Sequence, residues 1–419
     1  MSESRTNRRR VVITGLGVVS AIGIGKQAFW ESLALGKSGI RKISTFDVST
    51  YRCQVAGQIT NFDPLDFMSA QLARRIDRFA QLGLAAASLA VADSEIKISQ
   101  IEPGRAGAIV GTSLGTLSYA EEQFGLYHEK GLSRINPFFA TSVIPSTCVT
   151  QIMTNLELKG PCLTVTTACA SSTVAIGMAC RSIRDAETDV MLAGGSEAPI
   201  SPYVLATLGS LELLIPEDTE LANRYRPFSR DACGFALGEG SGVLVLEELS
   251  HAIARDAPIY AEVVGFGWSS DAHHVMSFAP VPEQAARAIK LALEDADLEP
   301  EKIEYVNAHG TAVLDLDRSE TEILKKVFGE HAYRIPVSTT KPFTGHTLGA
   351  SGALGATACT LMLGHEYLHP TLNYTASDPL CDLDYIPNEG YRRKVDYMLV
   401  VSFGFGGYNA ACILKRYLM

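Results

Sequence analysis

Short runs of β-branched and aliphatic residues alternate with alanine- and leucine-rich stretches of helical periodicity along most of this chain. Four such runs are residues 107–111, 163–166, 190–193 and 242–246. Strands that alternate with helices in this way predict an α/β fold whose sheets are buried.

One pattern occurs twice, a hydrophobic strand that runs into a Gly-x-Gly turn. Residues 10–17 read RVVITGLG, and residues 259–267 read IYAEVVGFG. The repetition predicts two similar α/β halves, an N-terminal half of residues 1–255 and a C-terminal half of residues 256–419.

The apolar segment of residues 11–25 follows the arginines at 8–10 and so has the outline of a secretion signal. Glycines interrupt the segment and its first residues are β-branched, so we expect a buried strand that enters a glycine turn. Ser20 occupies the third glycine position of a dinucleotide-binding fingerprint, which argues against a Rossmann cofactor site. No run of about 18 apolar residues occurs, so we expect no membrane span.

Composition narrows the class further. The chain has 419 residues, of which 47% are hydrophobic and 20% charged, an ordinary globular balance. Its formal net charge of −10 argues against a nucleic-acid partner, because binding to phosphates needs clustered Lys and Arg. Nine cysteines without CxxC spacing do not form a disulfide framework, which favours a reducing cytoplasm.

Cys169 stands where a β-branched run gives way to a helical pattern, within the small-residue sequence T-A-C-A-S-S of residues 167–172. At a helix N-terminus, free N–H groups and the macrodipole lower a thiol pKa below its ordinary value of about 8.5. We therefore predict that Cys169 is a nucleophile. The other cysteines are expected to be buried and inert: Cys53, Cys148, Cys162, Cys180, Cys233, Cys359, Cys381 and Cys412.

Two of the nine histidines follow predicted strands. His309 lies in Y-V-N-A-H-G-T, and His346 ends S-T-T-K-P-F-T-G-H before a helix of small residues. Carboxyl ends of strands are where α/β proteins place their active sites, so both are candidate partners of the thiol. The tail VSFGFGGYN at 401–409 predicts a tight turn that can bring backbone N–H groups to an oxyanion.

With the motifs T-A-C-A-S-S, N-A-H-G-T, T-K-x-x-T-G-H and G-F-G-G in this order, the chain resembles the β-ketoacyl-[acyl-carrier-protein] synthases of the thiolase fold. The resemblance covers nearly the whole chain. It implies a five-layered αβαβα fold made of two related halves, and a Cys-His-His site. Initiating synthases use Cys-His-Asn instead, and thiolases use a second cysteine.

Motif positions carry the expected roles onto this sequence. They imply Cys169 as nucleophile, His309 and His346 as the two histidines, Lys341 as the lysine that organises the site and Glu320 as its acidic residue. They imply an oxyanion hole from the N–H groups of Cys169 and Phe405, with Phe405 as a gate between Gly404 and Gly406. Contacts to the pantetheine arm or substrate are expected from Thr311, His274 and Asn409.

The resemblance also implies the chemistry. An acyl group arrives on the phosphopantetheine of an acyl carrier protein, transfers to Cys169 and is extended by two carbons when malonyl-carrier protein loses CO2. No metal or other cofactor is expected. The carrier protein and a second subunit, either another copy or a chain-length-factor-like chain, are the expected partners.

Some positions depart from the family pattern. Val313, Leu316 and Met276 stand where Thr, Asn and Thr are expected, and the R-P-F-D-x-x-R-D-G-F motif is altered at 226–235. These changes favour a polyketide-type ketosynthase subunit over a housekeeping fatty-acid elongating synthase, which stays the alternative. A non-catalytic chain-length-factor-like subunit is a further alternative, against which the presence of Cys169 argues.

Two further sequence patterns are candidate binding sites, one for a carrier protein and one for zinc. Arg74, Arg75 and Arg78 form a basic cluster suited to docking an acidic carrier protein, with an ordinary solvated helix face as the other interpretation. Residues 365–369 read H-E-Y-L-H, a zinc-protease pattern that needs one continuous helix. Pro370 follows immediately, so we do not expect a zinc site there.

Overall fold

The computed structural model describes residues 8–216, 224–276, 279 and 282–418. Its main sheet has the strand order β12-β11-β15-β16-β10-β1-β9-β7-β5-β6. In the N-terminal half these strands are β1 (Val11–Ser20), β5 (Ala106–Gly111), β6 (Cys162–Val165), β7 (Val190–Glu197) and β9 (Gly240–Glu248). In the C-terminal half they are β10 (Ala261–Ser270), β11 (Tyr305–Asn307), β12 (Val337–Ser338), β15 (Tyr397–Gly404) and β16 (Tyr408–Arg416).

The two halves follow the same path. The order β1-β9-β7-β5-β6 has its counterpart in β10-β16-β15-β11-β12, and each pairing is parallel or antiparallel in both halves alike. A short antiparallel contact between β1 and β10 joins them. The predicted boundary at residue 255 falls between α9 (Leu249–Ala254) and β10.

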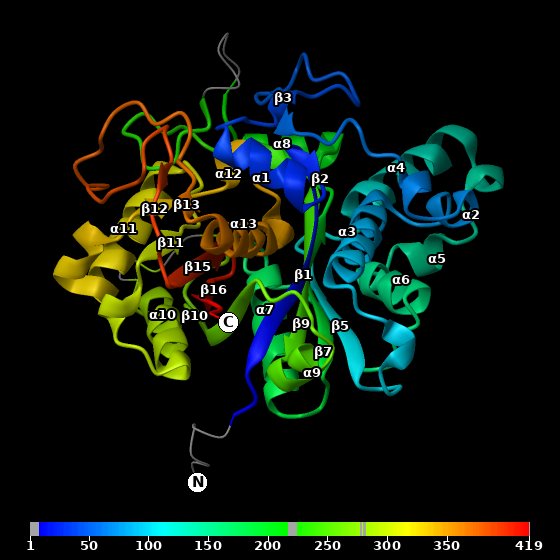
Figure 1. Ribbon diagram of the computed structural model, residues 1–419. Helices are drawn as coiled ribbons and strands as arrows, with labels where there is room; N and C mark the ends of the chain where they lie inside the picture. Colours follow the sequence, from blue (N-terminus) through cyan, green and yellow to red (C-terminus); the bar gives the residue numbers. More distant parts are fainter. Residues whose placement is uncertain (1–7, 217–223, 277–278, 280–281, 419) are drawn as a thin grey trace.

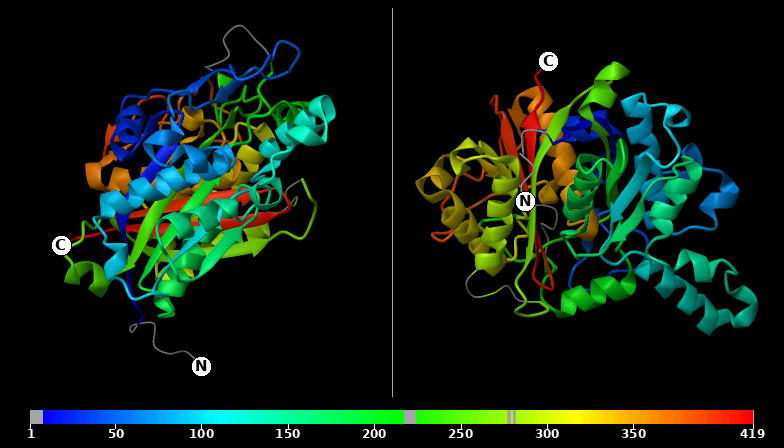
Figure 2. Two further views of the ribbon diagram at one scale, coloured as in Figure 1. Left: turned by 90° about the vertical axis from the view of Figure 1, so that its right-hand side faces the viewer. Right: turned by 90° about the horizontal axis from the view of Figure 1, so that it is seen from below.

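Helices cover both sheet halves and also fill the space between them (Figures 1 and 2). The outer layers are α3 (Arg78–Ser94) with α6 (Thr147–Asn155) on one side and α10 (Glu283–Ala296) with α11 (Leu314–Phe328) on the other. Between the halves lie α7 (Ser171–Arg184) and α13 (Ser351–His365), each of which contacts strands of both. The predicted five-layered αβαβα fold is confirmed.

The repeated Gly-x-Gly pattern has a packing cause that differs from the turn we predicted. The glycines lie inside β1 and β10, where an outer helix crosses the sheet closely. A Cβ atom on Gly17 would lie 1.8 Å from the Ala86 carbonyl oxygen of α3, and one on Gly267 would lie 2.1 Å from the Ala288 oxygen of α10. Each glycine therefore serves the close approach of a helix to a strand.

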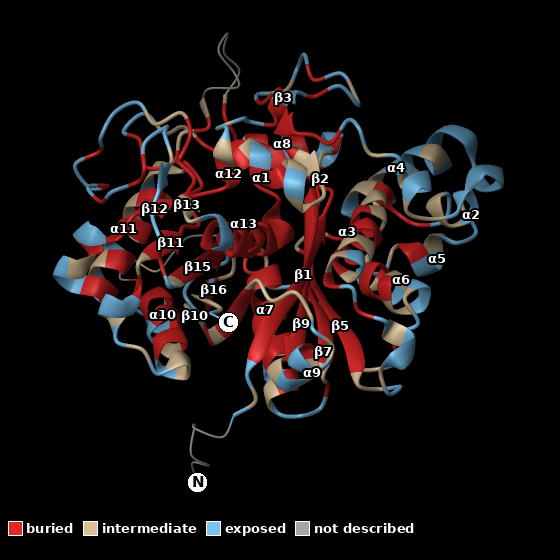
Figure 3. Ribbon diagram, viewed as in Figure 1, coloured by how far each residue is buried: buried red, intermediate tan, exposed pale blue. Residues whose placement is uncertain are grey.

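The middle layer is the most deeply buried part of the molecule (Figure 3). All residues of α13 from Ser351 to Leu363 are buried, and the helix is rich in Gly and Ala. A helix that is apolar all round needs protein on every side, which its position between two sheet halves provides. The outer helices α10 and α11 instead alternate buried and exposed positions.

The remaining elements surround this frame. The N-terminal apolar segment is the buried strand β1, as expected. No helix in the described part of the chain is long and apolar enough to cross a bilayer. The other helices are α1 (Lys26–Ala34), α2 (Ala70–Ala73), α4 (Leu117–Lys130), α5 (Phe139–Ser142), α8 (Pro202–Ser210) and α12 (Lys341–Thr344). The other strands are β2 (Gly23–Ile24), β3 (Ile40–Lys42), β4 (Val55–Gly57), β8 (Leu237–Gly238), β13 (Tyr367–Leu368) and β14 (Tyr391–Arg392).

Candidate active site

Cys169 lies in the turn between β6 and α7, as the small-residue motif predicted. Ala168 has a positive φ of 48°, which reverses the chain just before the thiol. The Thr167 N–H donates to the Ser171 hydroxyl oxygen (2.9 Å), which lies 2.6 Å from the Ala168 carbonyl oxygen. This local network fixes the turn, so the thiol is presented at the N-terminus of α7.

His309 is placed by a buried carboxylate. It follows β11, and the N–H groups of His309 and Gly310 each donate to Glu320 on α11, both at 2.7 Å. Lys341 Nζ donates to the His309 carbonyl oxygen. Local sequence patterns do not predict that Glu320 accepts the backbone N–H groups of His309, since the two residues lie in different elements.

His346 sits between α12 and the 3-10 turn of Leu348–Ala350, called η8. Its Nδ1 lies 2.9 Å from the Ser351 hydroxyl, and its N–H donates to the Ala236 carbonyl oxygen (2.8 Å). Phe235 packs edge-on against the imidazole, with ring centroids 5.1 Å apart. These contacts fix the ring and leave its Nε2 side for the cavity.

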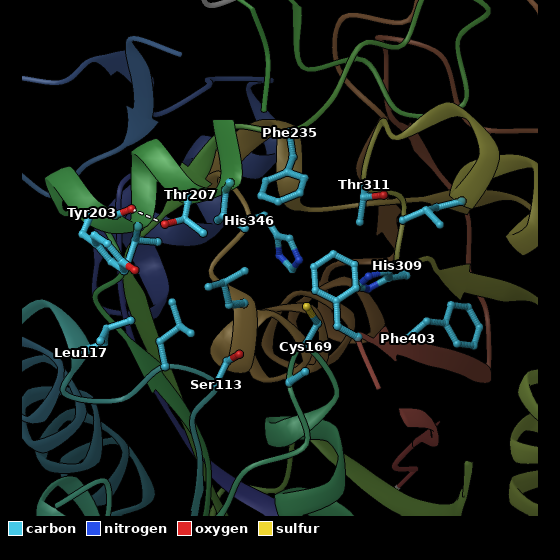
Figure 4. Close-up of a pocket in the computed structure, with 17 residues that line it drawn as sticks. Ser113, Leu117, Cys169, Tyr203, Thr207, Phe235, His309, Thr311, His346 and Phe403 are labelled. Atoms are coloured by element: carbon cyan, nitrogen blue, oxygen red, sulfur yellow. Dashed lines mark hydrogen bonds between the residues drawn. The ribbon is translucent and has the colours of Figure 1, made fainter. Parts of the chain in front are cut away.

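The three side chains meet. The Sγ atom of Cys169 and a ring nitrogen of each of His309 and His346 all lie within 4.8 Å of one another. The two imidazoles are nearly perpendicular, at 83° with centroids 5.5 Å apart. Figure 4 shows both rings directed toward the sulfur from the C-terminal half.

Burial sets the protonation of this group. Desolvation, reinforced by Lys341, holds the pKa values of His309 and His346 well below the ordinary value, so both rings are neutral at pH 7. Burial also lowers the pKa of Lys341 to about 8 and raises that of Glu320 to about 7. Neutral imidazoles can donate an N–H without adding charge.

The prediction of a lowered thiol pKa was wrong for the unacylated site. Burial raises the pKa of Cys169 to about 12, and this desolvation outweighs the opposing effects of Lys341 and of the N–H groups of Cys169 and Phe405. The turn position was read correctly, but the sequence did not show how completely the thiol is enclosed. Among the other cysteines, Cys162 is exposed rather than buried, and Cys233 is half-buried.

The glycine-rich tail forms the turn between β15 and β16 and faces the thiol. The N–H groups of Cys169 and Phe405 both approach the sulfur. Gly404 packs so closely that a Cβ atom there would lie 3.1 Å from the Cys169 nitrogen. Gly406 has a φ of 85°, and its N–H donates to the Val275 carbonyl oxygen (2.9 Å), which ties the turn to the segment after β10.

A largely apolar cavity opens at the thiol, with about 820 Å³ of space including its mouth. Figure 4 shows Ser113 and Leu117 on one side of Cys169, and His309, Thr311 and Phe403 on the other. Its remaining lining residues are Leu114, Ala168, Tyr203, Val204, Thr207, Leu208, Phe235, Leu316, His346, Leu348 and Phe405. The sequence did not point to the α8 residues among these, because their helix carries no chemical motif.

Two expected substrate contacts lie outside this lining. Asn409 is buried behind the tail turn, where its amide donates to Asp271 (2.7 Å). His274 is exposed, and its Nδ1 accepts the Met276 N–H (3.1 Å). Thr311, in contrast, lines the cavity, and no hydrogen-bond partner is present for its buried hydroxyl in the described part of the chain.

Sequence patterns also did not identify Asp317, whose buried carboxylate lies one helical turn before Glu320 on α11. It accepts the N–H groups of Thr311 (3.0 Å), Ala312 (3.1 Å) and Phe228 (2.7 Å). Burial raises its pKa to about 7. Together with Glu320 it holds the loop after β11 in place.

The basic cluster divides into two parts. Arg78 forms a two-pronged ion pair with the buried Glu239 (2.7 and 2.8 Å), so its role in the fold is structural. Arg74 and Arg75 are exposed in the turn between α2 and α3, where the Arg75 guanidinium stacks 4.3 Å from the Phe138 ring. Arg74 and Arg75 lie on an exposed turn rather than within a helix, and their exposure is compatible both with carrier docking and with an ordinary solvated surface.

The zinc-protease pattern lacks the required helix. His365 ends α13 and stacks on Trp30, Glu366 has a left-handed φ of 50°, and His369 lies beyond β13. The two histidines are therefore not on one helix face.

The site combines a thiol, two neutral imidazoles and a turn whose N–H groups can bind an oxyanion. In an αβαβα fold, this combination defines a condensing enzyme of the thiolase type. The family description "Beta-ketoacyl synthase, N-terminal domain" matches residues 8–252, and "Beta-ketoacyl synthase, C-terminal domain" matches residues 260–375. The chain therefore belongs to the β-ketoacyl synthase family.

Relatives of this chain match it along nearly its full length. The chain is 39% identical to the 3-oxoacyl-[acyl-carrier-protein] synthase 2 of Synechocystis sp., covering 98% of this chain and 99% of the relative. It is 40% identical to a Streptomyces halstedii protein described as a polyketide β-ketoacyl synthase, covering 97% and 98%.

Solved structures show the same resemblance. The ishigamide ketosynthase/chain length factor matches with a TM-score of 0.92 at 35% identity, covering 98% of this chain and 100% of that one. A type II polyketide ketosynthase in complex with its acyl-carrier protein matches with a TM-score of 0.91 at 32% identity, with the same coverage.

Proposed function

We propose that this enzyme carries an acyl chain on Cys169 and extends it by two carbons in a decarboxylative Claisen condensation with malonyl-acyl-carrier protein. The observation that carries the proposal is the meeting of the Cys169 sulfur with both imidazoles, within 4.8 Å, at the base of an apolar cavity. Each half of the molecule contributes to that meeting.

In the first step the Cys169 sulfur attacks the acyl thioester, the carrier's pantetheine thiol leaves, and the thiol proton passes to that leaving group. The N–H groups of Cys169 and Phe405 would hold the oxyanion of the tetrahedral intermediate. A donor of this kind typically contributes about 3–4 kcal/mol to the transition state. Because burial raises the pKa of Cys169 to about 12, the resting residue is a thiol, and its proton has to leave as the sulfur attacks.

In the second step malonyl thioester loses CO2, and the electron pair of the broken bond forms an enolate. His309 and His346, neutral because burial lowers their pKa values, would donate N–H bonds to the enolate oxygen. The enolate carbon attacks the Cys169 acyl group, a carbon–carbon bond forms, and the cysteine sulfur leaves and takes up a proton. Lys341, which donates to the His309 carbonyl oxygen, would hold that imidazole in place and offer positive charge.

No step here needs a resident metal or nucleotide. The phosphopantetheine arm arrives with its carrier. Its contacts are proposed at Thr311, which lines the cavity, and at His274 and Asn409, which lie outside the lining. Leu316 lines the cavity where the family pattern has Asn, so the arm meets a more apolar wall in this enzyme.

We assign the acyl chain to a polyketide pathway. The apolar Val313, Leu316 and Met276 at polar family positions, and the likeness to two type II ketosynthase structures, support this assignment. Elongation of fatty acyl chains is the second candidate, favoured by the 39% identity to a 3-oxoacyl-[acyl-carrier-protein] synthase 2.

Two protein partners follow. Arg74 and Arg75 are proposed to receive the acidic carrier protein. A second subunit, either another copy or a chain-length-factor-like chain, is proposed at β6, the terminal strand of the sheet, whose Leu163 is exposed.

Intact-mass measurement tests the reaction as a whole. The enzyme is first given an acyl-carrier protein and then malonyl-carrier protein. We expect the acyl mass to appear on the peptide that contains Cys169 and then to leave as a product two carbons longer. An acyl adduct at any other residue, or none, would contradict the proposal.

A further inference from the structure

Glu197 is the last residue of β7 and is fully buried. Its carboxylate accepts hydrogen bonds from the N–H groups of Ser113 (2.6 Å), Leu114 (3.1 Å), Gly115 (2.9 Å) and Gly349 (3.0 Å) and from the Thr112 hydroxyl (3.0 Å). Four of the five partners are backbone N–H groups, which can only donate, and the Thr112 hydroxyl is the one partner that could also accept. Burial raises the pKa of Glu197, but the hydrogen bonds from these donors lower it, so the geometry favours the ionised form.

These donors come from both halves of the molecule. Residues 112–115 form the loop after β5 in the N-terminal half, whereas Gly349 belongs to η8 in the C-terminal half. A Cβ atom on Gly349 would lie 2.4 Å from the Ser113 nitrogen, so the two segments touch backbone to backbone. Glu197 spans this contact and bonds to both sides of it.

The clamped segments are walls of the catalytic cavity. Ser113 and Leu114 line it from the loop, and Leu348, the neighbour of Gly349, lines it from η8. Figure 4 shows Ser113 on the side of Cys169 that leads toward α8, away from the imidazoles. An acyl chain on Cys169 would extend along this side.

We propose that Glu197 is a positioning residue that clamps loop 112–115 to η8 and so sets which acyl chains fit beside Cys169. This inference rests on the acyl-carrying function proposed above. Glu197 belongs to none of the motifs identified in the sequence. It touches neither the substrate nor the reacting atoms, so it would act by positioning the residues that line the cavity.

The clamp also has an electrostatic consequence. Two buried charges act on Cys169: Lys341 favours the thiolate, and Glu197 disfavours it. The two imidazoles that face the sulfur are neutral, and Glu320 and Asp317 act on Lys341. Removal of the Glu197 charge therefore favours the thiolate.

Three variants separate these effects. Glu197→Asp keeps the charge but shortens the reach of the clamp, Glu197→Gln removes the charge and places an amide against N–H donors, and Glu247→Gln is the control. Glu247 is equally buried, on the neighbouring strand β9, and bonds to Arg255 and Thr14 away from the cavity. For each variant, Cys169 acylation is timed with a short and a long straight-chain acyl-carrier protein, and iodoacetamide alkylation of Cys169 is followed against pH.

We expect both Glu197 variants to change the ratio of long-chain to short-chain acylation rates by about tenfold. Only Glu197→Gln should also shift the alkylation profile to lower pH, and Glu247→Gln should change neither. A wild-type chain-length ratio in both Glu197 variants would overturn the inference, and if Glu197→Gln does not fold, the ratio in Glu197→Asp decides. If the wild-type enzyme accepts no acyl donor, the proposed function fails instead.

Discussion

The two halves of the sheet are built alike but present different chemistry at equivalent places. The terminal strand β6 leads to Cys169, and its counterpart β12 leads to Lys341 and His346. One strand further in, β5 leads to the cavity loop 112–115, and its counterpart β11 leads to His309. The fold thus brings four equivalent strand ends to one cavity.

In both halves a buried carboxylate holds the loop that follows the inner of the two strands, β5 in one half and β11 in the other. Glu197 accepts N–H groups of the loop after β5, and Glu320 accepts those of His309 and Gly310 after β11. The difference lies in the neighbouring charge, because Lys341 acts on Glu320, whereas no cation is among the main influences on Glu197 in the described part of the chain. In the function proposed above, one half supplies the nucleophile Cys169 and a wall for the acyl chain, and the other supplies the two imidazoles that would donate N–H bonds to the enolate.

Removal of the Cys169 thiol is the strongest test of this division of chemistry between the two halves. We expect Cys169→Ala to lower the condensation rate by at least about a thousandfold, because the acyl chain loses its point of attachment. The control is Cys162→Ala on β6, whose thiol is exposed and lies outside the cavity lining. Product formation by mass spectrometry measures both, and substantial turnover by Cys169→Ala would contradict the assignment.

The pH dependence of the thiol sharpens the comparison. Burial raises the pKa of Cys169 to about 12, so the thiol form predominates at neutral pH and the thiolate fraction grows as pH rises. In a Cys162→Ala background, we expect the iodoacetamide rate at Cys169 to rise about tenfold per pH unit from pH 7 to about pH 10. A plateau with a midpoint below pH 8 would show that the thiolate is stabilised instead.

The smallest expected effect concerns the docking surface of the N-terminal half. Arg75→Glu should raise KM for acyl-carrier protein by about three- to tenfold, because an acidic partner meets a reversed charge. Lys290→Glu, an equal charge change on exposed α10, serves as the control. The iodoacetamide rate at Cys169 should be the same in both variants, and an unchanged KM in Arg75→Glu would remove docking from this surface.

Much of the fold could be predicted from local patterns in the sequence. The β-branched runs became β5, β6, β7 and β9, because alternation of strand and helix is a local signal. The thiol turn could also be read locally, from small residues between a strand and a helix.

What the sequence could not show depends on contacts between distant segments. The enclosure that raises the Cys169 pKa comes from both halves, and the Arg78–Glu239 ion pair joins residues far apart in the chain. The repeated Gly-x-Gly pattern by itself predicts a turn, because the helices that cross at Gly17 and Gly267 leave no local signal in the sequence. Glu197 carried no motif at all.

The division of labour between the halves is tested most directly by measuring Cys169 acylation and malonyl CO2 release in the same sample of a His309→Ala, His346→Ala enzyme. We predict acylation within about threefold of the wild-type rate, since the oxyanion groups and thiol remain, and CO2 release lowered by at least about a hundredfold. If both half-reactions fall together, or if CO2 release persists, the imidazoles do not serve the second step and the account is wrong.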